Sequence, residues 1–133
     1  MRVLVVEDDP VSRDLVAGAL RHGGHDVETA CDGREALEKL RGGAIRLVVS
    51  DWVMPGMSGP DLCRAIRATA GQGVYVILLT AKGAAARFDG LHAGADDYLD
   101  KPLDVNDLLA SVLAGQRVLA DAEAPRESAR KTV

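Results

Sequence analysis

Residues 46–59 read RLVVSDWVMPGMSG, an apolar run that ends in the carboxylate of Asp51 and continues into a Pro-Gly loop. Consecutive apolar positions are typical of a strand that is buried on both faces of a sheet. A carboxylate is costly to bury unless it is paired, hydrogen-bonded or bound to a metal. We therefore expect Asp51 to lie at the end of a buried strand, beside a partner.

Four more short apolar runs predict strands, so that the predicted strands cover residues 3–6, 27–30, 45–49, 74–79 and 98–99. Between the strands, apolar residues recur at helical spacing and predict five helices. The first follows Pro10, with Leu15, Val16, Ala19 and Leu20, and the next two cover 35–40 and the region around 62–66. The fourth is an Ala-rich segment with Phe88 and Leu91, and the last contains Val105, Leu108, Leu109, Val112 and Leu113. Alternating strands and helices predict an α/β fold, a parallel five-stranded sheet with helices on both sides. We expect one domain over residues 1–119, followed by a polar linker or disordered tail over 120–133.

The composition of the 133-residue chain restricts its function. Apolar residues make up 47% of the chain and aromatic residues only 3%, so the core must consist mainly of Val, Leu, Ile and Ala. The net charge of −4, with no Lys/Arg run, argues against direct nucleic-acid binding. Cys31 and Cys63 have no metal-ligand spacing and are interpreted as reduced thiols. The sequence has no charged leader and no apolar segment long enough for a signal peptide or a membrane span, so we expect a soluble, cytoplasmic protein.

Polar residues end four of the predicted strands. Strand-terminal residues matter because ligands of open parallel sheets bind beyond the carboxyl ends of the strands. These ends carry Glu7-Asp8-Asp9, Asp51, Thr80 and Asp100-Lys101-Pro102. Each residue alone has an ordinary interpretation: the acids as solvated turn residues, Thr80 as a helix N-cap, and Lys101 as a surface lysine. The chain has only four lysines, however, and one of them falls among these acids.

Together these side chains predict a phosphoryl-transfer site. Clustered carboxylates repel one another and need a cation, and all-oxygen ligation suits Mg²⁺ or Mn²⁺ better than zinc. With the cation, Lys101 would neutralise phosphoryl oxygens and Thr80 would donate a hydrogen bond to them. Asp51 would then be a nucleophile.

Four motifs in this order resemble the receiver domain of bacterial two-component response regulators, and in particular the chemotaxis regulators: VLVVEDDP, VVSDWVMPGMSG, LLTAKG and GADDYLDKP. The resemblance covers residues 2 to about 119. It implies a flavodoxin-like (βα)5 three-layer sandwich with strand order 2-1-3-4-5. It also implies phosphorylation by a sensor histidine kinase or a histidine phosphotransfer protein, no other enzymatic activity than its own phosphotransfer and dephosphorylation, an output domain or effector, and a homodimer on phosphorylation.

The resemblance also implies roles for individual residues. Asp51 matches the phosphoacceptor. Mg²⁺ would be held by Glu7 (through water), Asp8, Asp51 and the backbone carbonyl of Val53. Thr80 and Lys101 match the hydroxyl and the lysine that contact the phosphoryl group, with a cis bond between Lys101 and Pro102. Tyr98 matches the aromatic switch residue.

Three positions depart from the usual pattern of this family. Val53 is apolar and Lys82 is a cation, both on the approach of the attacking water, so they bear on the lifetime of the phosphate. Ser111 replaces an arginine on the dimer face of the winged-helix transcription-factor branch, so we do not expect that branch's dimer.

Three other classes of protein compete with this interpretation. A haloacid-dehalogenase-type phosphatase needs an aspartate at position 53. A flavodoxin needs hydroxyl and glycine donors in the first loop, where this chain has acids. A degenerate receiver that only binds partners would not need the complete set of Asp8, Asp51, Thr80 and Lys101.

Overall fold

The computed structural model describes residues 1–81 and 93–122. Over these residues the chain forms five strands, four α-helices and a 3-10 turn: β1 (Arg2–Val6), α1 (Pro10–His22), β2 (Asp26–Ala30), α2 (Gly33–Leu40), β3 (Leu47–Asp51), α3 (Gly59–Ala70), the 3-10 turn (Gly71–Gly73), β4 (Tyr75–Thr80), β5 (Asp97–Asp100) and α5 (Val105–Ala122). The helix predicted around Phe88 and Leu91, the position of Lys82 and most of the predicted tail lie outside the described residues. Within the described ranges, no helix has the length and apolar character needed to cross a membrane.

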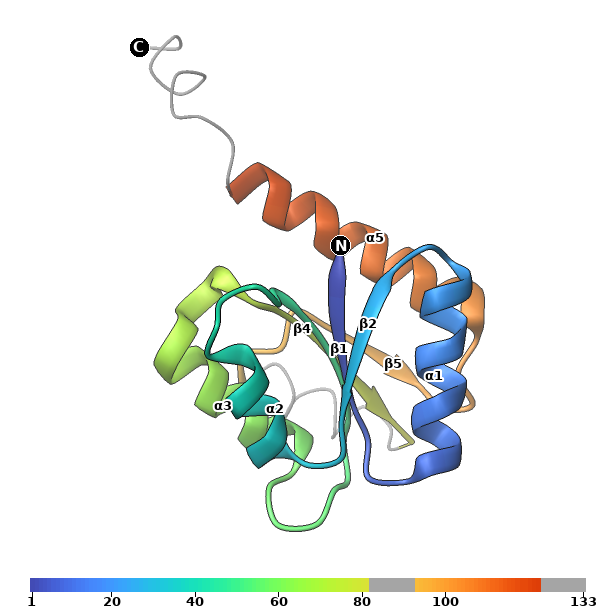
Figure 1. Ribbon diagram of the computed structural model, residues 1–133, viewed down its shortest axis with the longest axis horizontal. Coiled ribbons are helices and arrows are strands. Elements are labelled where there is room, and N and C mark those ends of the chain that lie inside the picture. Colours follow the sequence, from blue (N-terminus) through green and yellow to red (C-terminus); the bar gives the residue numbers. More distant parts are fainter. Residues whose placement is uncertain (82–92, 123–133) are drawn as a thin grey trace, which may run out of the picture.

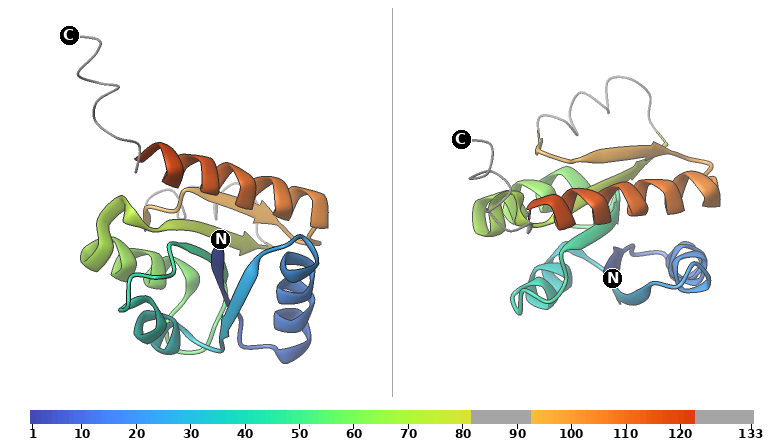
Figure 2. Two further views of the ribbon diagram at one scale, coloured as in Figure 1. Left: turned by 45° about the horizontal axis from the view of Figure 1, so that its top comes forward. Right: turned by 90° about the horizontal axis from the view of Figure 1, so that it is seen from above.

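The five strands form one parallel sheet in the order β2-β1-β3-β4-β5. The predicted flavodoxin-like strand order is therefore confirmed. Helices α1 and α5 cover one face of the sheet, and α2 and α3 cover the other (Figure 1). Helix α5, the longest helix in the described part of the chain, lies alongside β4 and β5 (Figure 2).

Each face of the sheet has its own apolar core. On one face, the buried side chains of β1, β3 and β4 pack against Val16, Ala17 and Leu20 of α1 and Leu108 and Val112 of α5. On the other face, they pack against α2 and α3. This division explains why the strands are apolar on consecutive positions.

Two of the predicted helix stripes are partly wrong. Leu15 was expected in the core, but 70% of it is exposed, and Val105 and Leu113 of α5 are exposed as well. Ser111 instead is buried, and its Oγ donates a 2.5 Å hydrogen bond to Asp97 Oδ2. A period of 3.6 residues allows several stripes on a short helix, and only contact with the sheet selects among them.

Helix starts follow local capping rules. The Asp9 side chain accepts a hydrogen bond from Ser12 N at the start of α1, where Pro10 is the first helical residue. At the start of α3, Ser58 and Asp61 form a capping box. Both helices therefore begin directly after loops that follow the acidic strand ends.

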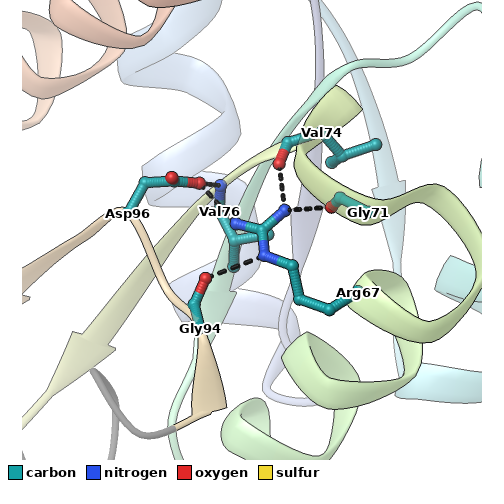
Figure 3. A network of polar contacts seen from close by, with 6 residues as sticks. All are labelled: Arg67, Gly71, Val74, Val76, Gly94 and Asp96. Carbon is teal, nitrogen blue, oxygen red and sulfur yellow. Dashed lines mark hydrogen bonds and ion pairs between the residues drawn. The ribbon is translucent and has the colours of Figure 1, made fainter.

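Arg67 of α3 braces the edge of the sheet opposite those strand ends (Figure 3). Its guanidinium donates hydrogen bonds to the backbone carbonyls of Gly71, Val74 and Gly94 at 2.7, 2.5 and 2.8 Å. It also forms a 2.6 Å ion pair with Asp96, whose Oδ2 accepts the Val76 amide at 2.8 Å. One side chain thus ties α3 to the start of β4 and to the segment that enters β5.

Candidate functional site

The sheet topology brings the acids together. Because β1 and β3 are adjacent and parallel with Val6 opposite Ser50, the next residues, Glu7 and Asp51, become neighbours. One carboxylate oxygen from each of Glu7, Asp8 and Asp51 lies within 4.8 Å of the others. Glu7 and Asp51 are buried, whereas Asp8 is exposed. The structure therefore unites the predicted acidic set, which lies at the carboxyl ends of two different strands.

Lys101 approaches Asp51 from β5. Its Nζ lies 2.6 Å from Asp51 Oδ1. Its backbone amide donates a 2.8 Å hydrogen bond to the carbonyl of Thr80, and the Lys101–Pro102 peptide bond is cis, as predicted. The lysine is therefore held at the edge of the sheet by the end of β4. With every acid ionised, three carboxylates face one ammonium, an excess of negative charge that suits a divalent cation.

Thr80 and Tyr98 complete the predicted set on the neighbouring strands. Thr80 is fully buried at the end of β4, opposite Asp100 of β5. Tyr98 is half-buried on β5 and packs against the core of the α2–α3 face. Their roles toward a phosphoryl group stay predictions.

Glu7 is the acid whose pKa is most affected by the site. Burial first, and then the negative charge of Asp51, raise the pKa of Glu7 from 4.5 to about 7, although Lys101 opposes this. A carboxyl in this position holds its proton at a pH where an exposed glutamate has lost it. Without a cation, the site therefore favours a protonated Glu7.

The raised pKa of Glu7 predicts a pH dependence of stability. In the unfolded chain Glu7 loses its proton near its usual pKa of 4.5, and in the folded protein near 7. Folding therefore takes up a proton between these values, and the metal-free protein should become less stable as the pH rises through this window. Thermal unfolding in EDTA at about pH 5 and about pH 8 should show this decrease, and Glu7→Gln should reduce it and raise the melting temperature at the higher pH. Glu38→Gln, at an exposed acid of α2, is the matched control and should keep the decrease. An unchanged pH dependence in Glu7→Gln would contradict the assignment.

In the loop after Asp51, buried and exposed residues alternate. Trp52 is only 7% exposed and Met54 is also buried, both in the core of the α2–α3 face, whereas Val53 is exposed. Its place directly after Asp51 in the sequence predicts a Trp52 indole at the rim of the acidic site, and this prediction is wrong, because strand alternation directs the indole into the core instead. The sequence also predicts Met54 as apolar filling under the loop, and its burial confirms this.

Two features near the site were missed at the level of the sequence. Arg13 Nη1 donates a 3.1 Å hydrogen bond to the Glu7 carbonyl, which fixes the start of the acidic turn to α1. Val11 and Leu15, four residues apart on α1, expose apolar side chains, and Leu15 lines a cavity that reaches Asp51 and Lys101. The spacing of Val11 and Leu15 was visible in the sequence, but the choice of which stripe faces the core was not.

The fold and the rim of acids, hydroxyl and lysine define a class of flavodoxin-like α/β proteins. A family model described as the response regulator receiver domain matches residues 3–113, and the chain belongs to this family of two-component signalling proteins. The transcriptional regulatory protein TcrA of Mycobacterium tuberculosis is 43% identical over 120 residues, which are 88% of this chain and 46% of TcrA. The response regulator MprA of Mycolicibacterium vanbaalenii is 40% identical over 133 residues, 99% of this chain and 57% of MprA. The chain thus spans about half the length of these curated relatives.

Solved structures agree with this family. The chemotaxis protein CheY4 of Vibrio cholerae superposes with a TM-score of 0.79 at 32% identity, over 86% of this chain and 97% of CheY4. A putative two-component response regulator with a GGDEF domain superposes with a TM-score of 0.84 at 32% identity, over 90% of this chain and 50% of that chain. The predicted resemblance to response regulator receiver domains is confirmed.

Proposed function

We propose that this receiver domain accepts a phosphoryl group on Asp51 from a phosphohistidine of a sensor histidine kinase or histidine phosphotransfer protein. The observation that carries the proposal is the 2.6 Å pair of Asp51 and Lys101 beside two further carboxylates. A carboxylate oxygen of Asp51 attacks phosphorus while the bond from phosphorus to the imidazole nitrogen breaks. Lys101 then pairs with a phosphoryl oxygen instead of Asp51, and the Thr80 hydroxyl donates to another. Beyond this transfer and the later loss of the phosphate, we expect no catalysis.

The donor set fits a hard divalent cation. Glu7, Asp8, Asp51 and the Val53 carbonyl would hold Mg²⁺, or Mn²⁺ in its place, and all four offer oxygen. When bound, the cation supplies positive charge that offsets the phosphoryl oxygens.

An exposed apolar surface supports a protein as the phosphodonor. Val11 and Leu15 are exposed on α1, and a cavity of about 340 Å³ between α1 and α5 is lined by Leu15 and Leu103 and reaches Asp51 and Lys101. Large exposed apolar side chains that border a reactive site fit the contact surface of a protein partner. We propose that the phosphohistidine-bearing protein docks here.

Phosphorylation would act on partners through Tyr98. A hydrogen bond from Thr80 to the phosphoryl group would bias a pre-existing equilibrium of the Tyr98 ring and of the surface of β5 and α5. A complete switch needs about 5 kcal/mol of differential stabilisation, which a few charge-assisted hydrogen bonds can supply. The relatives named as transcriptional regulators support an output domain under this control in the whole protein. A homodimer on phosphorylation and a cytoplasmic location stay predictions.

Trp52 offers the first test of the cation site. Trp52 directly follows Asp51 in the chain, so a cation on Asp51 that shifts this strand end should also shift the buried indole and change its emission. The titration should saturate at about millimolar Mg²⁺, because a site with few protein ligands binds this ion weakly. Asp8→Ala should abolish the change, and Asp14→Ala, an exposed acid on α1, should keep it. If emission and calorimetry both report no binding, the site is not a cation site and the chain is a partner-binding receiver only.

A further inference from the structure

Gly33, the first residue of α2, is buried beneath the side chain of Met57. A Cβ on Gly33 would lie 2.6 Å from Met57 Sδ and 3.1 Å from Met57 Cβ and Cγ. The backbone of Gly33 is not in the left-handed region, so the glycine is required for space and not for its backbone conformation. A methyl group at Gly33 would therefore force the side chain of Met57 to move from its present position.

Met57 holds the second half of the loop that carries Val53. Within this loop, Met54 is buried in the core, while Val53, Pro55 and Gly56 are exposed. Met57 returns to the protein and packs against the core of the α2–α3 face. The path of the exposed residues Pro55 and Gly56 thus depends on the position of Met57, and Val53 lies directly before Met54, the buried residue at the other end of this stretch.

Gly33 belongs to a turn, residues 30–33, that also contacts the acidic side of the site. The Glu7 amide donates a 3.0 Å hydrogen bond to the Ala30 carbonyl. The turn itself is tightly held, because Asp32 Oδ1 accepts the Glu35 amide at 2.8 Å and Glu35 Oε1 accepts the Cys31 amide at 2.6 Å. This turn therefore contacts the strand end at Glu7 through Ala30, and the end of the Val53 loop at Met57 through Gly33.

We propose that this turn positions the two sides of the cation site, with Gly33 and Met57 as positioning residues. The inference rests on the proposed cation binding by Glu7, Asp8, Asp51 and the Val53 carbonyl. Groups behind the ligands of a metal commonly fix ligand geometry and thereby affinity. A methyl group at Gly33 would displace Met57 and move the Val53 loop relative to the acids.

The test is a Mg²⁺ titration of the 133-residue chain, followed by Trp52 emission and by calorimetry. Gly33→Ala should weaken Mg²⁺ binding about tenfold while the protein stays folded. Gly18→Ala is the matched control, because Gly18 is helical and has open space around it, and should bind Mg²⁺ like the unsubstituted protein. Met57→Ala removes the anchor without adding volume and should also weaken binding, which keeps the test valid if Gly33→Ala unfolds.

A double-mutant cycle separates positioning from general packing. Gly33→Ala combined with Met57→Ala should bind Mg²⁺ about as weakly as Met57→Ala alone, because the two single changes disturb the same contact. Fully additive effects, or a dissociation constant in both single variants within about twofold of the unsubstituted protein, would overturn the inference. If the unsubstituted protein itself binds no Mg²⁺ by calorimetry, the proposed cation site is wrong. Gly33 and Met57 then have no cation site to position.

Discussion

Asp51→Asn should abolish phosphorylation of this protein by acetyl phosphate or by a phosphohistidine donor. The amide of asparagine keeps the shape of the side chain but is a poor nucleophile, and it removes the charge that pairs with Lys101 at 2.6 Å. Intact-mass analysis of the unsubstituted protein should show one added phosphate, and only when Mg²⁺ is present. Asp9→Asn, a neighbouring acid that caps α1, is the matched control and should still be labelled. Equal labelling of Asp51→Asn would contradict the assignment of the phosphoacceptor.

The same labelling distinguishes the parts of the proposal. Leu15→Ser should slow transfer from a phosphohistidine protein but not from acetyl phosphate, because only the protein donor needs the exposed surface of α1.

In the phosphorylated protein, changes in amide chemical shifts should extend from the loops around Asp51 to Tyr98. Shifts that stay confined to those loops would exclude the proposed switch while leaving the phosphoacceptor intact.

Arg67→Met should reduce the free energy of unfolding by about 3 kcal/mol, a large effect for a position outside the apolar core. The substitution keeps most of the side-chain volume but removes the guanidinium donor from three backbone carbonyls and leaves Asp96 with the Val76 amide and no cation beside it. Only 13% of the Arg67 side chain is exposed, so water cannot easily replace its part-buried hydrogen bonds to the carbonyls of Val74 and Gly94. Urea denaturation gives the free energy from the midpoint and slope.

Arg64→Met is the control for this prediction, because it removes the same charge from the same helix. The Arg64 side chain is 55% exposed and pairs with Asp61, one turn earlier, at 3.2 Å. Exposed pairs contribute little, so the change should stay within about 0.5 kcal/mol. Similar losses in the two variants would mean that the network of Arg67 does not brace the sheet.

Much of the fold follows from the sequence alone. The apolar runs and helical spacings predicted a parallel sheet covered on both faces, and the structure agrees within a few residues at each strand. The strand-end residues could be recognised as one site because parallel strands bring their carboxyl ends to the same edge. The assignment of roles to Asp51, Thr80, Lys101 and Tyr98 depended on the resemblance to a family, and not on spacing.

The details that the sequence left undetermined are those that depend on contact across the fold. Leu15 and Leu113 fit an apolar stripe as well as their buried neighbours do, and only the position of the sheet exposes them. The position of Trp52 directly after Asp51 predicts an indole at the rim of the acidic site, but the side chain packs in the core of the α2–α3 face.

The contacts between distant residues are decided by tertiary structure for a physical reason. Local propensity and periodicity act over a few residues, and they determined the strands, the helices and the acidic strand ends of this protein. Arg67 meets Asp96 29 residues further along the chain, and Met57 meets Gly33, only after the sheet has assembled and brought their elements together. The free energy of such contacts depends on burial and geometry that no short window of sequence contains.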